Sequence, residues 1–453
     1  MLERTFKLKE NGTDVKTEVI AGITTFMSMA YILAINPGML SEAGMNPQAV
    51  LIATALSAFV GTMCMALLAN YPFALASGLG LNAYFVYTVC GAMGYSWQFA
   101  LFAVFIEGII FIVISVTPVR EAIFNAIPFQ LKKGISVGVG LFIAFIGLQN
   151  GKVVVDGSSL VSIVPFREEF HTNGIWAALT IIGVFIIAIL YVKKVKGAVL
   201  IGMFATWIIG IICELTGIYT PVAELGLNST IPSGFEDFSF ASIGETFGAC
   251  FSSAAFENFN IADFVLIILA FLFVDVFDTL GALIGCADQA GSLDKYGKLP
   301  RIRPALLADA IATSVGAVFG TSTNTTFLES ASGVSVGGRT GLASVVTGLL
   351  FLVSLIISPV FISIPNFATA PALVFVGFLM MSAITGIDFN NPTESIPAYL
   401  VVLVTPLVYS ISDGIYIGII AYVVINLFAG NAKKINPLMY ILATLFVIKY
   451  AFL

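Results

Sequence analysis

Three acidic residues in strongly apolar surroundings are the side chains of this sequence best placed to do chemistry. Asp275 and Asp278 fall in the run IILAFLFVDVFDTLGALIGC, and Glu329 falls in the glycine-rich stretch TNTTFLESASGVSVGGRTG. An acid inside a membrane costs about 2.5–3.5 kcal/mol on insertion scales, so such residues usually face a pathway or a partner. We therefore expect these acids to bind a ligand or to carry protons.

The spacing of Asp275 and Asp278 places both on one face of a helix, with Thr279 beside them. Two carboxylates one turn apart in an apolar helix resist joint ionisation, so we expect at least one of them to hold a proton. This arrangement suits a proton carrier. For one of the two aspartates, the alternative is a structural hydrogen bond to a hydroxyl on another helix.

Glu329 lies where an extended segment, TTFLES, is expected to turn into a short half-helix inside the membrane. The start of such a half-helix exposes backbone N–H groups and a positive dipole end. The structural alternative is that Glu329 caps the helix. Asn82 follows a similar break in YPFALASGLGLN, and its amide fits either a heterocycle edge or an interhelical hydrogen bond. The other residues that we expect at the binding site are Phe327, Leu328, Ser77, Ser330, Thr279 and Thr25.

The composition indicates a membrane protein. Of the 453 residues, 58% are hydrophobic and 10% are charged, whereas about 25% of the residues of a soluble protein are charged. Continuous apolar runs recur, each long enough for a helix to cross a hydrocarbon layer of roughly 30 Å, which excludes a soluble fold and a transmembrane barrel. The five cysteines and the single histidine show no metal-ligand or disulfide spacing, so we expect no cofactor and no metal.

The apolar runs predict an all-α polytopic membrane protein with about fourteen transmembrane segments. The candidate spans lie near 18–39, 48–69, 76–91, 97–117, 132–150, 174–192, 196–217, 261–286, 304–320, 329–340, 341–360, 370–386, 396–411 and 413–430. The apolar stretch 437–453 is either a further span or an interfacial segment.

Lysine and arginine set the expected orientation, because they gather in cytoplasmic loops. With the N-terminus inside, every basic cluster is cytoplasmic, and the loop 218–260, which contains no lysine or arginine, lies outside. The clusters are Arg4, Lys7, Lys9 and Lys16; Arg120, Lys132 and Lys133; Lys193, Lys194 and Lys196; Lys295, Lys298, Arg301 and Arg303; and Lys433 and Lys434. We therefore expect a multi-pass protein of the plasma membrane, namely the bacterial inner membrane, with a cytoplasmic N-terminus.

The sequence also repeats itself. The octets ALASGLGL (74–81) and ESASGVSV (329–336) both contain Ala-Ser-Gly, and each opens one of the two short spans. An odd number of spans separates them, so the two copies have opposite topology. Short, glycine-interrupted segments at matching positions of an inverted repeat indicate the binding site of a secondary transporter. The alternative is that small residues simply let helices pack closely.

Three motifs, GITTFMSMAYILAINPGML, FVDVFDTLGALIG and TTFLESASGVSVGGRTGL, resemble the purine-permease branch of the nucleobase–cation symporters. The resemblance implies a seven-plus-seven inverted repeat, core and gate domains that move against each other, and proton-coupled import of hypoxanthine, guanine or adenine. The binding acids of that family correspond to Glu329 and to Asp275 or Asp278, and its span-three asparagine corresponds to Asn82. Each aspartate is a candidate both for substrate contact and for carrying the proton, and so is Glu329.

The expected organisation follows from the span positions and this resemblance. It comprises a cytoplasmic N-terminus (1–17), a first core region (18–118), a first gate region (119–217), an extracellular loop (218–260), a second core region (261–360), a second gate region (361–430) and a C-terminal segment (431–453).

Several alternatives stay open. A same-fold anion or pyrimidine transporter is the first, an intramembrane aspartyl hydrolase is a second of a different class, and a channel is a third. The expected partners are a purine, the lipid bilayer and protons, with sodium as the alternative coupling ion. A homodimer is left open, and no nucleic acid is expected.

Overall fold

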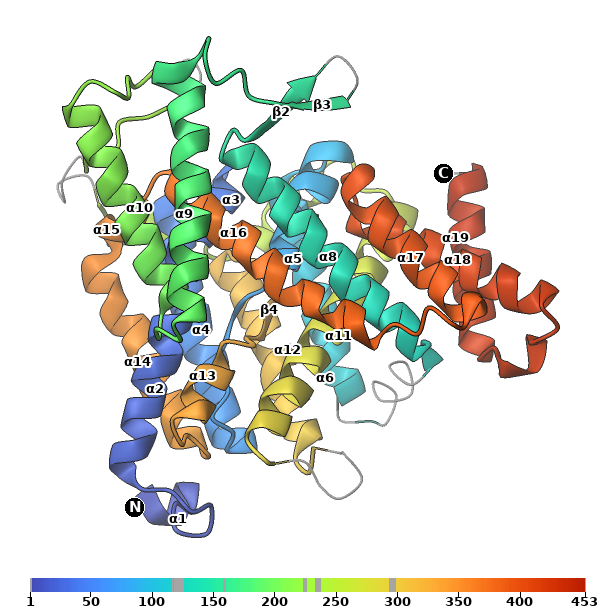
Figure 1. The fold of residues 1–453 in the computed structure, drawn as a ribbon. Coiled ribbons are helices and arrows are strands. Elements are labelled where there is room, and N and C mark those ends of the chain that lie inside the picture. Colours follow the sequence, from blue (N-terminus) through green and yellow to red (C-terminus); the bar gives the residue numbers. More distant parts are fainter. Residues whose placement is uncertain are drawn as a thin grey trace.

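The computed structural model is built almost entirely of helices (Figure 1). It describes residues 2–115, 117, 126–157, 160–222, 226–232, 238–292 and 299–452. Within these residues, ten helical segments are long and apolar enough to cross a membrane, and two shorter apolar helices cover Leu79–Ala92 and Pro437–Ala451. The all-α polytopic fold is therefore confirmed, while the count of fourteen spans stays a prediction.

Each half of the chain contains one short strand followed by a short helix. The first half contains α1 (Leu2–Phe6), α2 (Val15–Met29), α3 (Ile32–Ser41), α4 (Pro47–Cys64), β1 (Leu75–Ser77), α5 (Leu79–Ala83), α6 (Trp97–Ser115), α8 (Phe129–Asn150), β2 (Val154–Gly157), β3 (Leu160–Ile163), α9 (Ile175–Val192) and α10 (Ala198–Leu215). The second half contains α11 (Ile261–Gln289), α12 (Ile302–Phe319), β4 (Asn324–Thr326), α13 (Ser330–Ser335), α14 (Gly341–Ser354), α15 (Ser358–Ile362), α16 (Asn366–Met381), α17 (Pro392–Leu407), α18 (Ile411–Phe428) and α19 (Pro437–Phe452). A π-helical turn extends α4 to Ala69, and another extends α5 to Ala92.

The long helices form two groups that pack mainly within themselves (Figure 1). In the first helix group, comprising α2 to α6 and α11 to α14, α12 packs against α4 and α6, and α14 packs against α2 and α4. In the second helix group, comprising α8 to α10 and α16 to α19, α8 packs against α16 and α17, and α9 packs against α10 and α16. Each group thus combines segments from both halves of the sequence.

Strands β1 and β4 pair with each other at the centre of the first helix group. They run antiparallel, with Leu75 opposite Thr326 and Ser77 opposite Asn324, and all six strand residues are buried. Because backbone polar groups at membrane depth must be satisfied within the protein, two interrupted segments stabilise each other by pairing. This confirms the prediction of two short half-helices, each preceded by a short extended strand.

Hydroxyl groups on neighbouring helices satisfy backbone groups of this two-stranded sheet. Thr62 on α4 donates to the carbonyl oxygen of Leu75 (3.1 Å) and also lies 3.0 Å from the N–H of Leu75. Thr313 on α12 donates to the carbonyl oxygen of Asn324 (3.1 Å). The threonines that complete the sheet therefore come from the surrounding long helices.

The Ala-Ser-Gly repeat does not mark structurally equivalent positions. In the first octet, Ala76 and Ser77 belong to strand β1, and Gly78 precedes α5. In the second octet, Ala331, Ser332 and Gly333 already lie inside helix α13. The strand equivalent to β1 is NTT, which precedes the second octet. The repeat therefore identified the right two regions with the wrong register.

The C-terminal end of α13 is held by two charged side chains. Arg339 donates from Nη1 to the carbonyl oxygen of Val334 (2.7 Å), at the end of the helix. Glu18, buried on α2, accepts from the backbone N–H groups of Arg339 (2.8 Å) and Ala343 (3.1 Å). These bonds fix α13 and the start of α14 to α2.

Helix α19 runs antiparallel along α18. Lys449, in its last turn, lies 3.6 Å from the carboxylate of Asp413 in the first turn of α18. The rings of Tyr416 and Phe446 stack between the two helices, with centroids 4.1 Å apart. In Figure 1 the C-terminus accordingly lies at the end of the molecule opposite the N-terminus.

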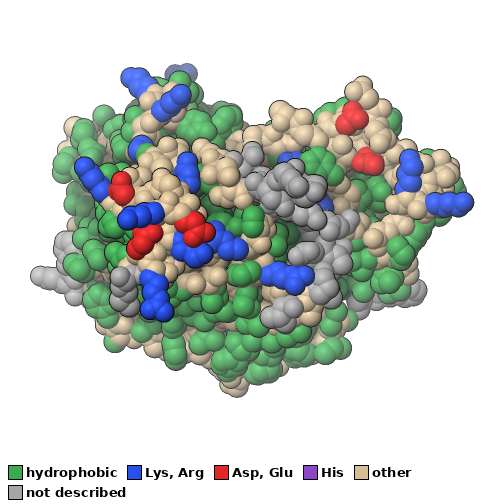
Figure 2. Space-filling view, turned by 90° about the horizontal axis from the view of Figure 1, so that it is seen from below, with side chains coloured by type: hydrophobic (Ala, Val, Ile, Leu, Met, Phe, Trp, Pro, Cys, Tyr) green, Lys and Arg blue, Asp and Glu red, His purple; other side chains and the backbone are tan. Residues whose placement is uncertain are grey.

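Lysine and arginine side chains gather on the face of the molecule that carries the N-terminus (Figure 2). Charged groups on this face are interspersed with polar and apolar side chains. Arg120, Lys295 and Lys298, which we assigned to the same side, lie outside the described residues. The gathering agrees with the expected clustering of basic residues.

Candidate functional site

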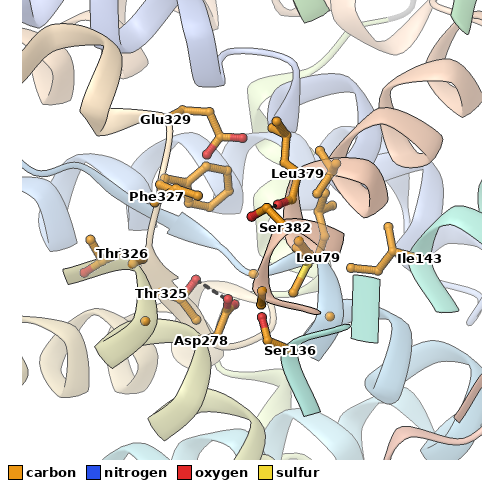
Figure 3. Close-up of a pocket in the computed structure, with 18 of the residues that line it drawn as sticks. Leu79, Ser136, Ile143, Asp278, Thr325, Thr326, Phe327, Glu329, Leu379 and Ser382 are labelled. Atoms are coloured by element: carbon orange, nitrogen blue, oxygen red, sulfur yellow. Dashed lines mark hydrogen bonds between the residues drawn. The ribbon is translucent and has the colours of Figure 1, made fainter. Parts of the chain in front are cut away.

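A cavity of about 300 Å³ lies between the two helix groups. Its first wall comes from the first helix group and consists of Tyr31, Gly78, Leu79, Gly80, Asp278, Gly281, Ala282, Thr325, Thr326, Phe327, Leu328 and Glu329. Its second wall comes from α8, α16 and the turn after α16, and it consists of Lys133, Ser136, Ile143, Val376, Leu379, Met380, Ser382 and Ala383. Figure 3 shows Glu329, Phe327 and Asp278 across the cavity from Leu379, Ser382 and Ile143.

Glu329 occupies the last position before helix α13, and its side chain is half-buried at the cavity wall. It makes no capping hydrogen bond to α13. Instead, its carboxylate accepts a hydrogen bond from the hydroxyl of Tyr31, a buried residue at the start of α3. The capping alternative is therefore not what the structure shows, and the carboxylate is available to the cavity.

The two half-helices present different groups to the cavity. At α13, the first amides are already bonded, because Ser330 donates to the carbonyl oxygen of Phe327 (3.1 Å) and Ala331 donates to that of Leu328 (3.0 Å). At α5, the cavity wall is formed by the helix start itself, Gly78 to Gly80. The first N–H groups of a helix have no partner within that helix. The amide of Gly78 is already bonded to the carbonyl oxygen of Thr323 (2.9 Å). Of the two half-helix starts, that of α5 is therefore the one placed to offer amides, those of Leu79 and Gly80, to a ligand.

Asp278 is the second carboxylate at the cavity. It projects from α11 and accepts a hydrogen bond from the hydroxyl of Thr325 at 3.4 Å (Figure 3). Thr325 belongs to β4, so the acid on the long helix is linked to the crossing strand. Asp278 and Glu329 thus reach one wall from two separate elements.

Asp275 faces a different environment, although it lies on the same helix as Asp278. The hydroxyl oxygen of Thr279 is 3.0 Å from a carboxylate oxygen of Asp275 and 2.9 Å from one of Asp309 on α12. All three side chains are fully buried, and none is among the residues that line the cavity. Asp275 therefore faces the contact between α11 and α12, whereas Asp278 faces the cavity. The two aspartates do not share one environment, contrary to what the sequence had suggested.

Asn82 and Ser77 belong to a buried polar network beside the cavity. Ser77 donates to the amide oxygen of Asn82 (2.8 Å), and the amide nitrogen of Asn82 donates to Asn36 on α3 (2.7 Å). Asn36 donates in turn to Thr54 (2.7 Å) and Thr321 (2.8 Å). Because both ends of the Asn82 amide are used within the protein, this geometry corresponds to the interhelical alternative.

Of the remaining expected residues, two line the cavity and two are buried in the helix packing behind it. Phe327 and Leu328 line the cavity. Ser330 is buried, and its hydroxyl accepts from the backbone N–H of Ala74 (3.0 Å), which links α13 to the segment before β1. Thr25 is buried on α2 where α13 passes closest, since a Cβ atom on Gly333 would lie 2.1 Å from its hydroxyl oxygen.

Six polar residues of the cavity were not among the expected site residues: Tyr31, Thr325, Thr326, Lys133, Ser136 and Ser382. Thr325 lies four residues before Glu329 in a quoted motif, so its place near an intramembrane acid was a usable signal. Tyr31 lies in a quoted motif that contains no acid, so its contact with Glu329 had no such signal. Lys133 and Ser136 are one turn apart on α8. They were read only as part of a basic loop and an apolar span, because nothing in the sequence indicates that α8 faces β4.

Beyond the cavity, the two helix groups meet again along the second half of α8. Phe142 on α8 and Tyr409 after α17 pack with ring centroids 5.0 Å apart, and Tyr87 of the first group lies 5.3 Å from Tyr409. At the end of α8, Asn150 donates to the carboxylate of Glu42, which follows α3 (3.2 Å). We call these five residues the closing contact.

Comparison with known proteins gives a consistent result. A family model described as "Permease family" (Xan_ur_permease) matches residues 16–417. A putative permease of Methanocaldococcus jannaschii is 46% identical over 100% of this chain and 98% of its own length. The guanine/hypoxanthine permease PbuO of Bacillus subtilis is 42% identical over 98% and 99% of the two chains. The adenine permease AdeP of Escherichia coli is 40% identical over 100% and 96%.

Solved structures show the same fold at low sequence identity. The transmembrane domain of the cyanobacterial bicarbonate transporter BicA superposes with a TM-score of 0.62 and 14% identity, covering 88% of this chain and 96% of that one. The murine anion transporter Slc26a9 in its inward-facing state gives a TM-score of 0.60 and 10% identity, covering 91% and 68%. At these identities the likeness concerns the fold alone.

Proposed function

We propose, from the premise that the chain belongs to the Permease family, that it imports a purine nucleobase by proton symport. The chain is a multi-pass membrane protein. Because its named relatives are permeases, it is a transporter and not an enzyme. The observation that carries the proposal is the pair of carboxylates, Asp278 and Glu329, on one wall of a cavity between two helix groups.

The chemistry of the cavity suits a flat, uncharged heterocycle. A 6-oxopurine presents N–H donors along one edge, and a carboxylate is a strong acceptor for such donors. In the proposed complex, Glu329 or Asp278 accepts from this edge, while donors meet the ring acceptors. The donors available are the amides at the start of α5, the hydroxyl of Ser136 and the ammonium of Lys133. Phe327 offers an aromatic surface at the same wall.

The purine assignment is supported by the named relatives, two of which are a guanine/hypoxanthine permease and an adenine permease. The fold itself does not decide the substrate, because structures with the same fold are named as bicarbonate and anion transporters. Two carboxylates facing the cavity argue against an anion, since like charges repel in a site of low dielectric. A pyrimidine is the remaining alternative within this chemistry.

We propose that the coupling proton is held by Asp275 and Asp309. The hydroxyl of Thr279 has one hydrogen, yet its oxygen lies within 3.0 Å of both carboxyl groups. Both contacts are hydrogen bonds only if one carboxyl is protonated and donates to Thr279. Because Asp275 is one helical turn from Asp278, a change at this pair can alter the position or charge of the substrate-facing acid. A sodium ion would be the alternative coupling ion.

Transport by alternating access requires one side of the cavity to close while the other opens. We propose that the first helix group is the core domain, that the second is the gate domain, and that the closing contact seals one side. The positions of the walls support this, because every cavity residue belongs to one group or the other. The closing contact joins the two groups again further along α8, through Tyr87 and Tyr409 and through Glu42 and Asn150. The cytoplasmic N-terminus is part of the same proposal.

The decisive experiment replaces the acid at the half-helix. Glu329→Gln preserves size but removes the charged acceptor, so we expect hypoxanthine uptake into cells or proteoliposomes to be lost or severely reduced. Glu168→Gln, which changes an exposed acid outside the cavity wall, is the matched control and should transport normally. Competition by guanine, adenine, xanthine and uracil then assigns the preferred base. Near wild-type uptake by folded Glu329→Gln protein would refute the assignment.

The coupling ion is tested separately. A protonophore should abolish concentrative hypoxanthine uptake, whereas replacing sodium with potassium should leave it unchanged. Asp275→Asn should uncouple uptake from the pH gradient while substrate still binds, because this residue does not line the cavity. Uptake that persists without a proton gradient and requires sodium would overturn the choice of ion but not that of substrate.

A further inference from the structure

The segment before α11 exposes an unusual set of phenylalanine side chains. We call residues 239–259 the phenylalanine segment; it contains three 3₁₀ turns, Phe240–Glu245, Ala249–Phe251 and Ser253–Phe256. Phe240, Phe247, Phe251 and Phe256 each expose 48–56% of their surface in this structure. A loop surrounded by water rarely carries so many exposed phenylalanines without covering them.

Aromatic contacts place this segment beside a membrane-spanning helix rather than beyond its end. The ring of Phe251 lies 4.9 Å from that of Phe105, and the ring of Phe256 lies 4.9 Å from that of Phe102. Helix α6 begins at Trp97 and is a candidate membrane span. At about 1.5 Å per residue, Phe105 lies about 12 Å along the axis from that start. The segment therefore descends well below the start of α6.

The phenylalanine side chains continue a surface of α6 that is itself exposed and apolar. Ile109 and Val113 lie further along α6 and are exposed, and Phe102 and Phe105 are half-exposed on the same helix. In a membrane-spanning helix such a surface faces lipid, because the hydrocarbon core is about 30 Å thick and a helix of this length crosses most of it. Phe251 and Phe256 extend this surface sideways without interruption.

Polar backbone groups of the segment form hydrogen bonds within the protein, as surroundings of lipid require. Amides within it bond to carbonyls three residues back, for example Phe251 to Gly248 (2.9 Å) and Ala255 to Ser252 (3.1 Å). Gly248 also donates to the carbonyl oxygen of Val318 (2.7 Å), and Thr246 donates to that of Phe319 (2.9 Å). The segment thereby covers the end of α12. Irregular backbone at membrane depth needs such partners.

We propose that the phenylalanine segment is a re-entrant, lipid-facing segment that anchors the first helix group in one leaflet of the bilayer. Its polar contacts are with this group: Ser96 donates to the carbonyl oxygen of Ala254 (3.0 Å), and Asn46 donates to Glu245 (2.9 Å). Acyl chains cover the exposed rings, so this part of the expected extracellular loop 218–260 lies within the bilayer. The segment therefore moves with the first helix group and resists displacement of that group along the membrane normal.

The proposal is tested by site-specific quenching in the full-length chain. The five native cysteines are replaced by alanine, and a single cysteine is introduced as Phe251→Cys or, separately, as Phe256→Cys. Each protein is labelled with the fluorophore NBD and reconstituted into phosphatidylcholine vesicles. Ile163→Cys is the matched control, because Ile163 is also a large exposed apolar residue (65%) but lies in the β2–β3 hairpin, which projects beyond the helices (Figure 1).

We expect nitroxide-labelled lipid to remove most of the fluorescence at positions 251 and 256, and aqueous iodide to remove little. The control position should show the reverse. Iodide quenching at 251 and 256 equal to that at 163 would place the segment in water and overturn the proposal. Protection from both quenchers would mean that another protein surface, such as a second copy of this chain, covers the rings, which is equally incompatible with the proposal. None of these results depends on the transported substrate.

Discussion

At the scale of single residues, the site is defined by which acids face the cavity. Glu329 and Asp278 line it, whereas Asp275 turns to Thr279 and Asp309 within the protein. The sequence could predict that these acids are functional, because acids are rare and costly at membrane depth. It could not predict which one faces the cavity, because α11 is apolar on nearly all sides and its hydrophobic pattern does not distinguish lipid, protein and cavity.

Tyr31 is the residue whose role is most directly testable at this scale. Its hydroxyl donates to Glu329, and both side chains border the cavity. A hydrogen bond to a charged group contributes about 1.5–3 kcal/mol, and 1.4 kcal/mol is about tenfold in an equilibrium constant. We therefore expect Tyr31→Phe to raise the KM for hypoxanthine about tenfold, because Glu329 loses the bond that orients it. The measurement is initial uptake rate against substrate concentration.

The matched control for this prediction is Tyr191→Phe, which removes a half-exposed tyrosine hydroxyl on α9, outside the cavity wall. It should leave KM unchanged. Thermal unfolding of both purified variants shows whether Tyr31→Phe has altered the fold instead of the site. An unchanged KM for Tyr31→Phe would mean that Glu329 holds its position without this hydroxyl.

At the scale of elements, the sequence predicted the two interrupted segments but not their alignment. Small residues and polar runs mark places where a membrane helix breaks, so both strand–helix units could be expected. The shared Ala-Ser-Gly letters misled the alignment, because the same small residues occupy different positions in the two units. Gly78 precedes α5 in extended backbone and leaves room for the side chain of Thr325, whereas Gly333 lies within α13 and allows it to approach α2. Local sequence does not distinguish a glycine that precedes a half-helix from one that lies inside it.

The close approach of α13 to α2 leads to a prediction about Gly333. A Cβ atom there would lie 2.1 Å from the hydroxyl oxygen of Thr25 and 2.6 Å from the backbone carbonyl of Ala21. The second contact is with backbone, so α13 would have to move. Overpacking of this kind typically costs about 1–3 kcal/mol. We expect Gly333→Ala to lower the thermal unfolding midpoint and to weaken purine binding, since Glu329 directly precedes α13.

Gly244→Ala provides the comparison for Gly333→Ala, because a Cβ atom at Gly244 meets no heavy atom within 4 Å. That variant should unfold at the wild-type temperature and transport normally. If Gly333→Ala behaved in the same way, the half-helix would tolerate displacement. The site geometry would then not depend on its contact with α2.

At the scale of the whole molecule, the two helix groups explain why the second cavity wall was missed. Hydropathy locates helices along the chain, but it does not say which lipid-spanning helices pack together, because lipid and protein surroundings are similarly apolar. The grouping of α8 with α16 and α17 brings residues far apart in sequence to face β4 and α13. The family resemblance implied such a division, whereas Lys133 and Ser136 could be assigned to the cavity only from coordinates.

If transport requires the two helix groups to separate at the closing contact, joining them there should stop it. Glu42 and Asn150 are suitable because they belong to different groups, lie near the surface and are 3.2 Å apart through their polar atoms. We expect Glu42→Cys/Asn150→Cys, in a background without native cysteines, to lose uptake after treatment with a short bis-methanethiosulfonate. Reduction should restore uptake, because it cleaves the cross-link without altering the protein.

A cross-link within one helix group separates this effect from mere chemical modification. Asn46 and Glu245 are also in polar contact, at 2.9 Å, but both belong to the first helix group or to the segment attached to it. Cross-linked Asn46→Cys/Glu245→Cys should therefore keep transporting. Because the two pairs receive the same reagent, a difference between them reports relative motion of the groups. Normal uptake by the fully cross-linked Glu42→Cys/Asn150→Cys protein would mean that substrate crosses without opening this contact, and alternating access between these two groups would have to be abandoned.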